Sequence, residues 1–347
     1  MIKKIIYIYS LAITLLFTGC SSNVPEKKHN TLTTPTPSPS SILTPTPELT
    51  WSKIDIKSTD HFFDIDFVDR NFGWLVGGEP QGVVFHTKNG GITWEKQIIP
   101  VTQSLRSVSF VDKSNGWVCG KKSTIIYTSN GGEFWNSSAN GMTSELFLTS
   151  IFFIDKNLGW CGGEMGELYR TVDSGKNWKR QYGITVRQQV RNISGTSENN
   201  LWSVLYSGEL YKYSGEDSWI DKTPMDFTKQ YRLDNNILNG VSFSSDSKFG
   251  ILVGEKGTIL ITQDGGENWS KSRNIPSIKL NKVQVLDNKN AFVVGDNGTI
   301  LFTSDGAVTW TIQKSPINEN LNNIFMFDQS SVWIVGNNGT LLKYTSK

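Results

Sequence analysis

Short apolar runs separated by polar turns fill the chain from Trp51 onward. In one unit the runs lie around Val108, Val118, Ile126 and Trp135, and the turns between them are rich in Asn, Ser, Lys and Gly. Runs of this length with β-branched and aromatic residues predict β-strands. No stretch after residue 50 sustains the 3.6-residue apolar period of an amphipathic helix. The pattern therefore predicts an all-β protein.

This strand pattern recurs seven times, with a period of about 42 residues. One series lies on the second strand of each unit: Trp74, Trp117, Trp160, Trp202, Ile251, Phe292 and Trp333. The other lies on the fourth strand: Trp51, Trp94, Trp135, Trp178, Trp219, Trp269 and Trp310. Four short strands per unit of 40 to 45 residues are typical of a propeller blade. Residues 50–347 are therefore predicted to form a seven-bladed β-propeller of four-stranded blades.

The phase of the repeat predicts how the ring closes. Trp51 aligns with the fourth-strand series, although no complete unit precedes it, and the last unit ends at Tyr344 without a fourth strand. We expect residues 51–56 to pair with the strand around 341–343. This pairing would complete the seventh blade and leave no long sheet edge open.

The first twenty residues have the pattern of an export signal. A basic start precedes an uncharged run that ends at Phe17 and is too short to span a bilayer. The following Thr18-Gly19-Cys20 resembles the lipobox of bacterial lipoproteins, although Phe17 stands where Leu is usual. The resemblance implies that residues 1–19 are removed and that Cys20 is acylated. The alternatives are an uncleaved anchor and plain secretion.

Residues 20–49 are predicted to be a tether. Thr, Ser and Pro dominate this segment, and Pro-rich stretches favour extended polyproline geometry. Together with the signal, the tether leads us to expect an exported chain that is lipid-anchored to the outer face of a bacterial cell membrane.

A turn with the pattern Ser/Thr-x-Asp-x-Gly-x-Thr-Trp links the third and fourth strands of five units. It resembles the Asp-box, or bacterial neuraminidase repeat, and a decayed copy spans residues 213–219. Its short polar side chain is expected to cap its own turn by accepting hydrogen bonds from backbone N–H groups, so we expect a structural role. The capping residues are Asn89, Asn130, Asp173, Asp264 and Asp305.

Whole units resemble the photosystem II stability and assembly factor family of cyanobacteria and chloroplasts. Residues 110–120 and 295–303 carry the resemblance, which extends over residues 51–347. It implies a seven-bladed propeller that acts as a non-enzymatic assembly scaffold. A photosynthetic role does not follow from it, because this repeat is widespread in bacteria without photosystems. The family's partner-binding arginines have no residue-by-residue match in this sequence.

Charge and composition narrow the possible partners. The chain has 34 basic and 32 acidic residues, a formal net charge of +2, which does not suit a nucleic-acid binder. Three His and three Cys leave little material for a metal centre, so no metal or cofactor is expected. Cys119 and Cys161 are predicted to be buried free thiols on opposite sheet faces, with a disulfide as the alternative. We expect a monomeric propeller that binds a protein partner or a cell-wall glycan.

One face of the ring holds the residues that are candidates for binding. The residue after the first apolar position of each blade should border the channel mouth: Phe63, Arg106, Thr149, Arg191, Asn239, Asn281 and Asn322. Arg187 and Lys282 should lie nearby. A longer connection within residues 221–236 adds Phe227, Tyr231 and Arg232 on the same face. These residues either only solvate the mouth or bind a partner.

Three function classes remain open. The leading hypothesis is a non-catalytic, surface-anchored scaffold, because no catalytic constellation is evident. A sialidase-like propeller would need three arginines for the substrate carboxylate and a Tyr nucleophile, and the candidate arginines near the channel are Arg106, Arg187 and Arg191. Another propeller glycoside hydrolase would need two facing carboxylates, for which Asp64, Asp66 and Glu79 are available. The third class is a carbohydrate-binding module on the cell wall.

Overall fold

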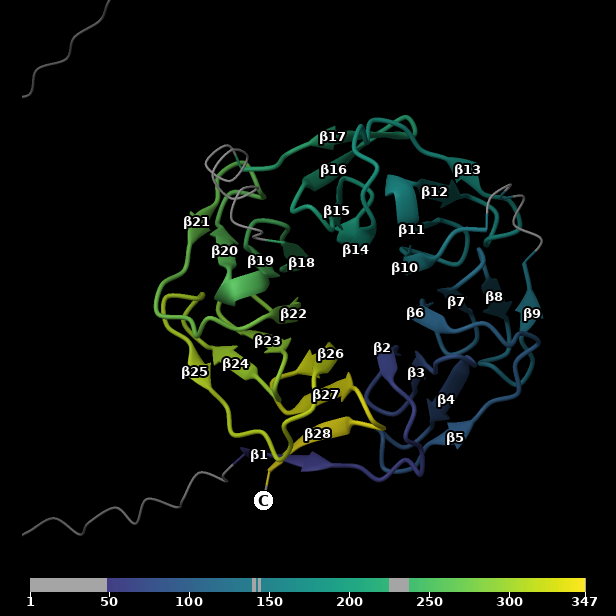
Figure 1. The fold of residues 1–347 in the computed structure, drawn as a ribbon, viewed down its shortest axis with the longest axis horizontal. Coiled ribbons are helices and arrows are strands. Elements are labelled where there is room, and N and C mark those ends of the chain that lie inside the picture. The colour runs from purple at the N-terminus through teal and green to yellow at the C-terminus, as the bar shows by residue number, and fades with distance from the viewer. Residues whose placement is uncertain (1–48, 139–141, 143–144, 225–236, 347) are drawn as a thin grey trace, which may run out of the picture. The chain divides into compact units, whose positions relative to one another are not determined.

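The computed structural model describes residues 49–138, 142, 145–224 and 237–346, all within one compact unit that covers residues 46–347. Seven four-stranded antiparallel sheets surround a central channel as the blades of a propeller (Figure 1). The all-β, seven-bladed prediction is confirmed. The predicted signal, Cys20 and nearly all of the tether lie outside the described residues.

The strands follow one another in chain order within blades 1 to 6, and in blade 7 the outer strand is the N-terminal β1. Blade 1 contains β2 (Phe62–Phe67), β3 (Gly73–Gly77), β4 (Val83–Thr87) and β5 (Glu95–Lys96). Blade 2 contains β6 (Leu105–Phe110), β7 (Gly116–Gly120), β8 (Ile125–Thr128) and β9 (Asn136–Ser137). Blade 3 contains β10 (Leu148–Phe153), β11 (Gly159–Gly163), the 3-10 turn η1 (Glu164–Gly166), β12 (Leu168–Thr171) and β13 (Lys179–Arg180). Blade 4 contains β14 (Val190–Ser197), β15 (Asn200–Leu205), β16 (Leu210–Gly215) and β17 (Ser218–Asp221).

The remaining three blades have the same plan. Blade 5 contains β18 (Leu238–Phe243), β19 (Gly250–Gly254), the 3-10 turn η2 (Glu255–Gly257), β20 (Ile259–Thr262) and β21 (Ser270–Lys271). Blade 6 contains β22 (Leu280–Val285), β23 (Ala291–Gly295), β24 (Ile300–Thr303) and β25 (Thr311–Ile312). Blade 7 contains β26 (Leu321–Asp328), β27 (Ser331–Gly336), β28 (Leu341–Ser346) and β1 (Leu49–Lys53).

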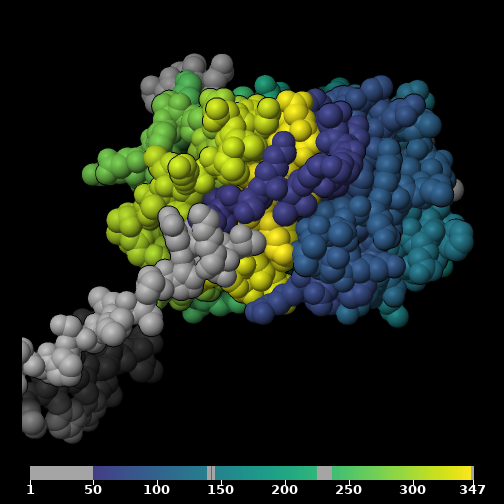
Figure 2. Space-filling view, turned by 90° about the horizontal axis from the view of Figure 1, so that it is seen from below, coloured from purple at the N-terminus to yellow at the C-terminus, as the bar shows by residue number. Residues whose placement is uncertain are grey.

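The ring closes as the repeat phase predicts. Strand β1 pairs antiparallel with β28, with Trp51 opposite Tyr344, and Ile54 N–H donates to Leu341 O at 2.8 Å. The strand spans residues 49–53, slightly earlier than the expected 51–56. Figure 2 shows this N-terminal segment lying across the C-terminal strands of the last blade. The blade is therefore shared between the two ends of the propeller.

Stacked aromatic rings join several blades to the next. Trp74 of blade 1 stacks flat on Phe110 of blade 2, with ring centroids 3.5 Å apart, and the Asp-box Trp135 meets the same Phe110 edge-on at 5.9 Å. Trp117 stacks likewise on Phe153 at 3.6 Å, and Trp333 of blade 7 stacks on Phe67 of blade 1 at 4.0 Å. The two tryptophan series therefore pack together on shared Phe rings.

Small residues make room for these rings. A Cβ at Gly116 would lie 2.3 Å from the Phe110 ring. In blade 4 the arrangement is reversed, because Leu201 replaces the glycine and Gly195 replaces the phenylalanine opposite it. The Gly-Trp pairs of the sequence therefore reflect steric fit within a blade as well as packing between blades.

In three blades the indole N–H group of the second strand bonds to the Asp-box turn of the next blade, whereas Trp202 Nε1 donates to Asn200 Oδ1 in its own strand. Trp74 Nε1 donates to Gly131 O at 3.1 Å, and Trp117 Nε1 donates to Ser174 O at 2.8 Å. The buried Trp160 Nε1 has no partner among the described residues. The decayed Asp-box copy lies in the following blade, so the motif that supplies the carbonyl elsewhere is missing there.

Cys119 and Cys161 are free and buried, as predicted. Both nevertheless belong to the same core cluster, between blades 2 and 3. The sequence argument placed them on opposite sheet faces and took this as separation. In a ring, however, opposite faces of neighbouring blades pack against each other.

The indole bonds predict a difference between two equivalent substitutions. Trp74→Phe removes a hydrogen bond that is made, whereas Trp160→Phe removes a buried N–H that has no partner. Both lose the same ring volume. We expect Trp74→Phe to lower the free energy of unfolding by ~1–2 kcal/mol more than Trp160→Phe. Urea unfolding of both variants and the wild type measures this, and an equal or larger loss for Trp160→Phe would contradict it.

Candidate functional site: the central channel and its mouth

The two faces of the propeller carry different loops. In blade 6, the loop between the second and third strands bonds to the connection that leads into the next blade, through Gly298 N–H and Glu319 O at 2.8 Å. The Asp-box turn of that blade bonds instead to the turn between the first and second strands, through Gly306 N–H and Lys289 O at 3.0 Å. We call the first of these the mouth face and the second the Asp-box face.

The five predicted capping residues lie in the Asp-box turns and accept hydrogen bonds from backbone N–H groups. Asp173 Oδ1 accepts from Asn177 N at 2.9 Å, and Asn89 Oδ1 accepts from Thr93 N at 2.9 Å. The same bond is present at Asn130, Asp264 and Asp305. For Asp264, the N–H and side-chain amide of Asn268 hold the pKa at about 2. These residues stabilise turns on the face opposite the mouth.

Every first strand contains a β-bulge at its second residue. The register with the second strand shifts there in all seven blades. A bulge leaves one residue outside the ladder and re-aims its side chain. The bulged residues are those expected to border the mouth: Phe63, Arg106, Thr149, Arg191, Asn239, Asn281 and Asn322. The sequence located these positions but did not predict the bulge.

Four of the bulged residues tie neighbouring blades together. Asn239 Nδ2 donates to Leu280 O at 2.8 Å, and Asn322 Nδ2 donates to Phe62 O at 2.8 Å. Asn281 makes the same bond to blade 7 at 2.9 Å, and the Thr149 hydroxyl donates to the corresponding carbonyl of blade 4. The amide and hydroxyl side chains at the mouth thus form a ring of contacts between blades.

The two bulged arginines are held by aromatic rings instead. The Arg106 guanidinium lies 3.5 Å from the Phe63 ring centroid, and Arg191 lies 4.4 Å from that of Tyr206. The Nε atoms of both arginines are buried without a partner among the described residues. Burial lowers both pKa values, but arginine remains charged in proteins. Two oriented cations therefore lie at the mouth.

Neighbouring groups extend the mouth around Arg106. Glu79 Oε2 lies 3.4 Å from Arg106, and Glu79 Oε1 lies 2.6 Å from Lys121. The hydrogen bond from Lys121 lowers the pKa of Glu79. Phe147 packs beside Arg106, with its centroid 5.0 Å from the guanidinium. Glu79, a candidate catalytic carboxylate, is thus the counter-ion of two cations.

Of the other residues predicted for the mouth face, the structure describes only Arg187 and Lys282. Arg187 is exposed in the connection before β14. Phe227, Tyr231 and Arg232 lie outside the described residues. Lys282, expected near the mouth, instead faces the channel.

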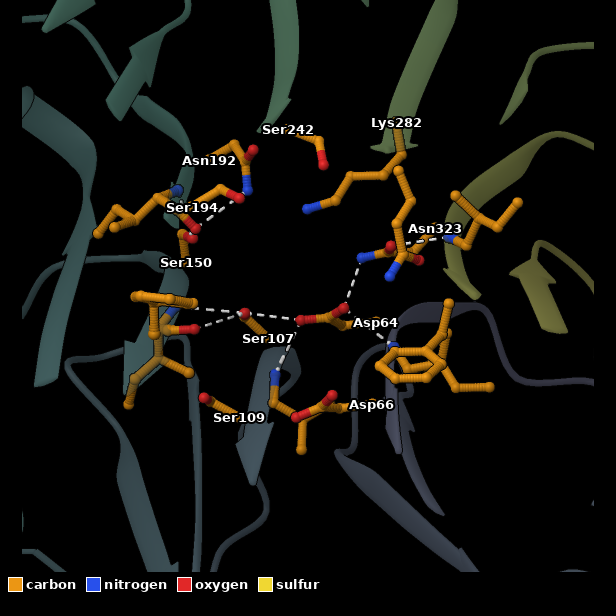
Figure 3. A pocket seen from close by; sticks show the side chains of 18 of the residues that line it. Asp64, Asp66, Ser107, Ser109, Ser150, Asn192, Ser194, Ser242, Lys282 and Asn323 are labelled. Atoms are coloured by element: carbon orange, nitrogen blue, oxygen red, sulfur yellow. Dashed lines mark hydrogen bonds between the residues drawn. The ribbon is translucent and has the colours of Figure 1, made fainter. Parts of the chain in front are cut away.

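Inside the mouth, the third and fifth residues of the first strands line a cavity of about 250 Å³ (Figure 3). We call it the channel cavity. Its lining includes serine and asparagine side chains and three charged residues, Asp64, Asp66 and Lys282. The sequence analysis treated the two aspartates as ordinary acidic residues or candidate catalytic groups. Polar residues recur at these two positions, which is the signal that it missed.

The lining is polar because the inner edge of each sheet has backbone N–H groups without a partner strand. Each first strand pairs on one side only, so its other side presents N–H groups that need acceptors. Side chains of the preceding blade supply them: Val108 N donates to Asp64 Oδ2 at 2.9 Å, and Phe110 N donates to Asp66 Oδ2 at 2.7 Å. Serines do the same, because Ser109, Ser150 and Ser242 each accept an N–H of the next blade at 2.9–3.0 Å.

The two aspartates differ in the number of hydrogen bonds that they already accept and in their pKa values. Asp64 accepts from Ser107 Oγ at 2.7 Å and from two backbone N–H groups at 2.9 Å, and Asn323 Nδ2 donates to it as well. Burial raises the pKa of Asp64, against the charge of Lys282 and these hydrogen bonds. Burial, together with the charge of Asp64, raises the pKa of Asp66 to about 7. Asp66 is therefore partly protonated near neutral pH.

Lys282 is the only cation among the described lining residues. Burial lowers its pKa, and the charges of Asp64 and Asp66 act in the opposite direction. Of the described parts of the chain, no group of His, Cys, Asp or Glu is arranged to hold a metal ion. The same residues include no helix long and apolar enough to cross a membrane.

The raised pKa of Asp66 predicts a pH-dependent effect of Asp66→Asn. The folded protein binds a proton at Asp66 between about pH 4 and 7 that the unfolded chain releases, so this stabilisation is lost as pH rises. The variant should match the wild type at pH 4 and exceed its free energy of unfolding by ~1–2 kcal/mol at pH 8. This is below the ~4 kcal/mol of a three-unit shift, because solvent reaches part of the side chain.

Asp305→Asn is the control for that measurement. A hydrogen bond from the Thr309 side chain lowers the pKa of Asp305, so the sign is opposite: this stabilisation is lost only as pH falls below the unfolded pKa near 4, and the stability deficit of Asp305→Asn should change little between pH 4 and pH 8. Urea unfolding at both pH values tests the pair. A pH-independent difference for Asp66→Asn would contradict the prediction.

Comparisons with known proteins agree with the architecture. A structure titled "YCF48 bound to D1 peptide" has 23% sequence identity and a TM-score of 0.71, covering 86% of this chain and 97% of that chain. YCF48 from Cyanidioschyzon merolae has 20% identity and a TM-score of 0.71, covering 85% and 99%. Virginiamycin B lyase from Staphylococcus aureus also reaches 0.71 at 13% identity, covering 86% and 99%. At these identities the likeness shows the fold alone.

No curated protein sequence matches this chain. The family model described as Photosynthesis system II assembly factor YCF48 matches residues 44–222 and 274–345, which is most of the propeller. The chain therefore belongs to the YCF48 family of photosynthesis system II assembly factors.

Proposed function

We propose that this protein is a lipid-anchored, extracytoplasmic propeller that binds a segment of a partner protein at its mouth face and acts as a non-catalytic assembly scaffold outside photosynthesis. The observation that carries the proposal is the pair of oriented arginines, Arg106 and Arg191.

The arginines are suited to hold carboxylates. Aromatic stacking orients the guanidinium plane of each, so fewer rotamers are lost when a partner binds. Arg191 forms no ion pair with a described residue, whereas Arg106 shares Glu79 with Lys121. A planar guanidinium binds a carboxylate through two parallel hydrogen bonds. The fitting partner is an extended protein segment with acidic side chains or a free carboxyl terminus.

Apolar contacts at the same place suit a peptide more than a bare ion. Phe63 and Phe147 flank Arg106, and Tyr206, 41% exposed, lies under Arg191. Aromatic residues and arginine are the types most often found at the energetic centres of protein interfaces. A YCF48 relative has been solved bound to a D1 peptide, which supports peptide binding as the mode for this chain.

The described carboxylates near the channel support a non-catalytic role. Asp64 accepts hydrogen bonds from both neighbouring blades, and Glu79 pairs with two cations. Each has a structural use.

Substitution of the arginines tests the binding site. In the full-length chain, Arg106→Gln with Arg191→Gln should reduce the recovery of a cross-linked partner at least tenfold, as expected for loss of two interface arginines. Arg70→Gln is the matched control, because Arg70 also pairs with a carboxylate, Asp328, and contacts an aromatic ring, Phe327, but at the turn between β2 and β3 on the Asp-box face. Quantitative mass spectrometry of membrane fractions measures recovery. Unchanged recovery with the double variant would overturn the proposed site.

Acylation of Cys20 is tested separately. Fatty-acid labelling should mark the wild type and Cys119→Ala, whose thiol is buried in the propeller, but should not mark Cys20→Ser. Label on Cys20→Ser would contradict the proposed anchor.

A further inference from the structure

The channel cavity contains a cation whose charge is not matched by a contact. Lys282 extends from β22 into the cavity, and no hydrogen bond to a described residue reaches its Nζ (Figure 3). Lys282 is half-buried, and partial removal of an unpaired ammonium from water costs free energy. The two aspartates influence its pKa, yet neither forms an ion pair with it within 4.0 Å.

The two carboxylates of the cavity differ in how many hydrogen bonds they accept from the protein and in how readily they bind a proton. Asp64 takes four donated hydrogen bonds from the protein, so little of its accepting capacity remains. Asp66 takes the Phe110 N–H and has a pKa of about 7, so near neutral pH a large fraction of it carries a proton. The negative charge available to Lys282 is therefore smaller than two carboxylates would suggest.

The hydroxyl groups of the lining have unused donors. Ser109, Ser150 and Ser242 accept backbone N–H groups of the next blade. A hydroxyl has one O–H donor as well as its acceptor lone pairs, and none of these three O–H groups donates to a described residue. The cavity therefore contains three hydroxyl donors and the ammonium of Lys282 that have no acceptor among the described residues.

We propose that the channel cavity is a binding site for a small oxyanion, either a free organic carboxylate or phosphate, with Lys282 as its charged contact and the hydroxyls of Ser109, Ser150 and Ser242 as donors. The volume of about 250 Å³ equals roughly eight water molecules at ~30 Å³ each. It admits an organic acid of a few carbon atoms. The arginines at the mouth would attract an anion toward the cavity. This site does not depend on the proposed peptide-binding function.

Binding should depend on pH through the groups that face the ligand. Asp64 and Asp66 face it from β2, Lys282 faces it from β22, and Arg106 and Arg191 lie at the mouth. Burial lowers the pKa of Lys282 while Asp64 and Asp66 act against it, and Asp66 itself has a pKa of about 7. Ionisation of Asp66 above about pH 7 should weaken oxyanion binding.

Isothermal titration of the full-length protein with succinate, and separately with inorganic phosphate, tests the proposal. We expect at least one probe to bind the wild type at pH 6 and to bind at least tenfold more weakly to Lys282→Met, which keeps the aliphatic stem and removes the charge. Lys279→Met is the matched control, because Lys279 lies three residues away and pairs with Glu255. It should bind as the wild type does. The stronger of the two probes identifies the class of oxyanion.

Asp66→Asn keeps the test valid if Lys282→Met fails to fold. This variant cannot ionise, so it should retain at pH 8 the affinity that the wild type loses between pH 6 and pH 8. Absence of binding by both probes, equal binding by Lys282→Met, or equal loss at pH 8 in Asp66→Asn would each overturn the proposal. Loss of partner capture in the arginine variants would leave these titrations unchanged, so the two hypotheses fail separately.

Discussion

The contact between a tryptophan of one blade and the first strand and Asp-box turn of the next is the interaction on which the propeller depends. A four-stranded blade buries too little by itself, and its faces must be covered by its neighbours. Trp74 shows how this is done, because its ring stacks on Phe110 and its N–H bonds to Gly131 O in the same neighbour. One side chain thus fixes both the spacing and the rotation between two blades. Trp160 lacks this bond, so the junction between blades 3 and 4 is secured by packing alone at this position.

A second constraint acts at the centre of the ring. The inner strands are sheet edges that cannot pair with one another, so their N–H groups take side-chain acceptors from the preceding blade. This requirement places carboxylates, hydroxyls and amides around the channel for structural reasons. Lys282 is different, because it accepts no N–H group and cannot serve that purpose. A polar channel in this protein is therefore the default, and Lys282, the one cation among the described lining residues, is the exception that needs a functional explanation.

The repeat made the fold predictable, whereas the site needed geometry. The positions of Trp51 and Tyr344 alone predicted which strands close the ring. The last unit lacks its fourth strand, and a segment with the fourth-strand pattern stands before the first complete unit. The mouth residues were also located by phase. Their roles were not, because the repeat says nothing about a bulge that turns Asn239 toward Leu280 O and Arg106 onto Phe63. The buried environment of Asp66 depends on residues of other blades, which no local pattern reveals. Both Cys119 and Cys161 are free and buried as predicted, but their shared cluster was missed for the same reason, since sheet faces that are opposite within one blade become partners across a ring.

The pairing of β1 with β28 has a mechanical consequence. In the proposed lipid-anchored form, the tether would join the propeller at Leu49, the first residue of the strand that closes the ring. Tension along that segment would act first on this short row of backbone hydrogen bonds, before any other part of the propeller. Trp51, packed against Tyr344 and Phe292, is the first buried side chain that resists the pull. In the proposed anchored form, the five residues that close the ring would therefore also be its point of attachment.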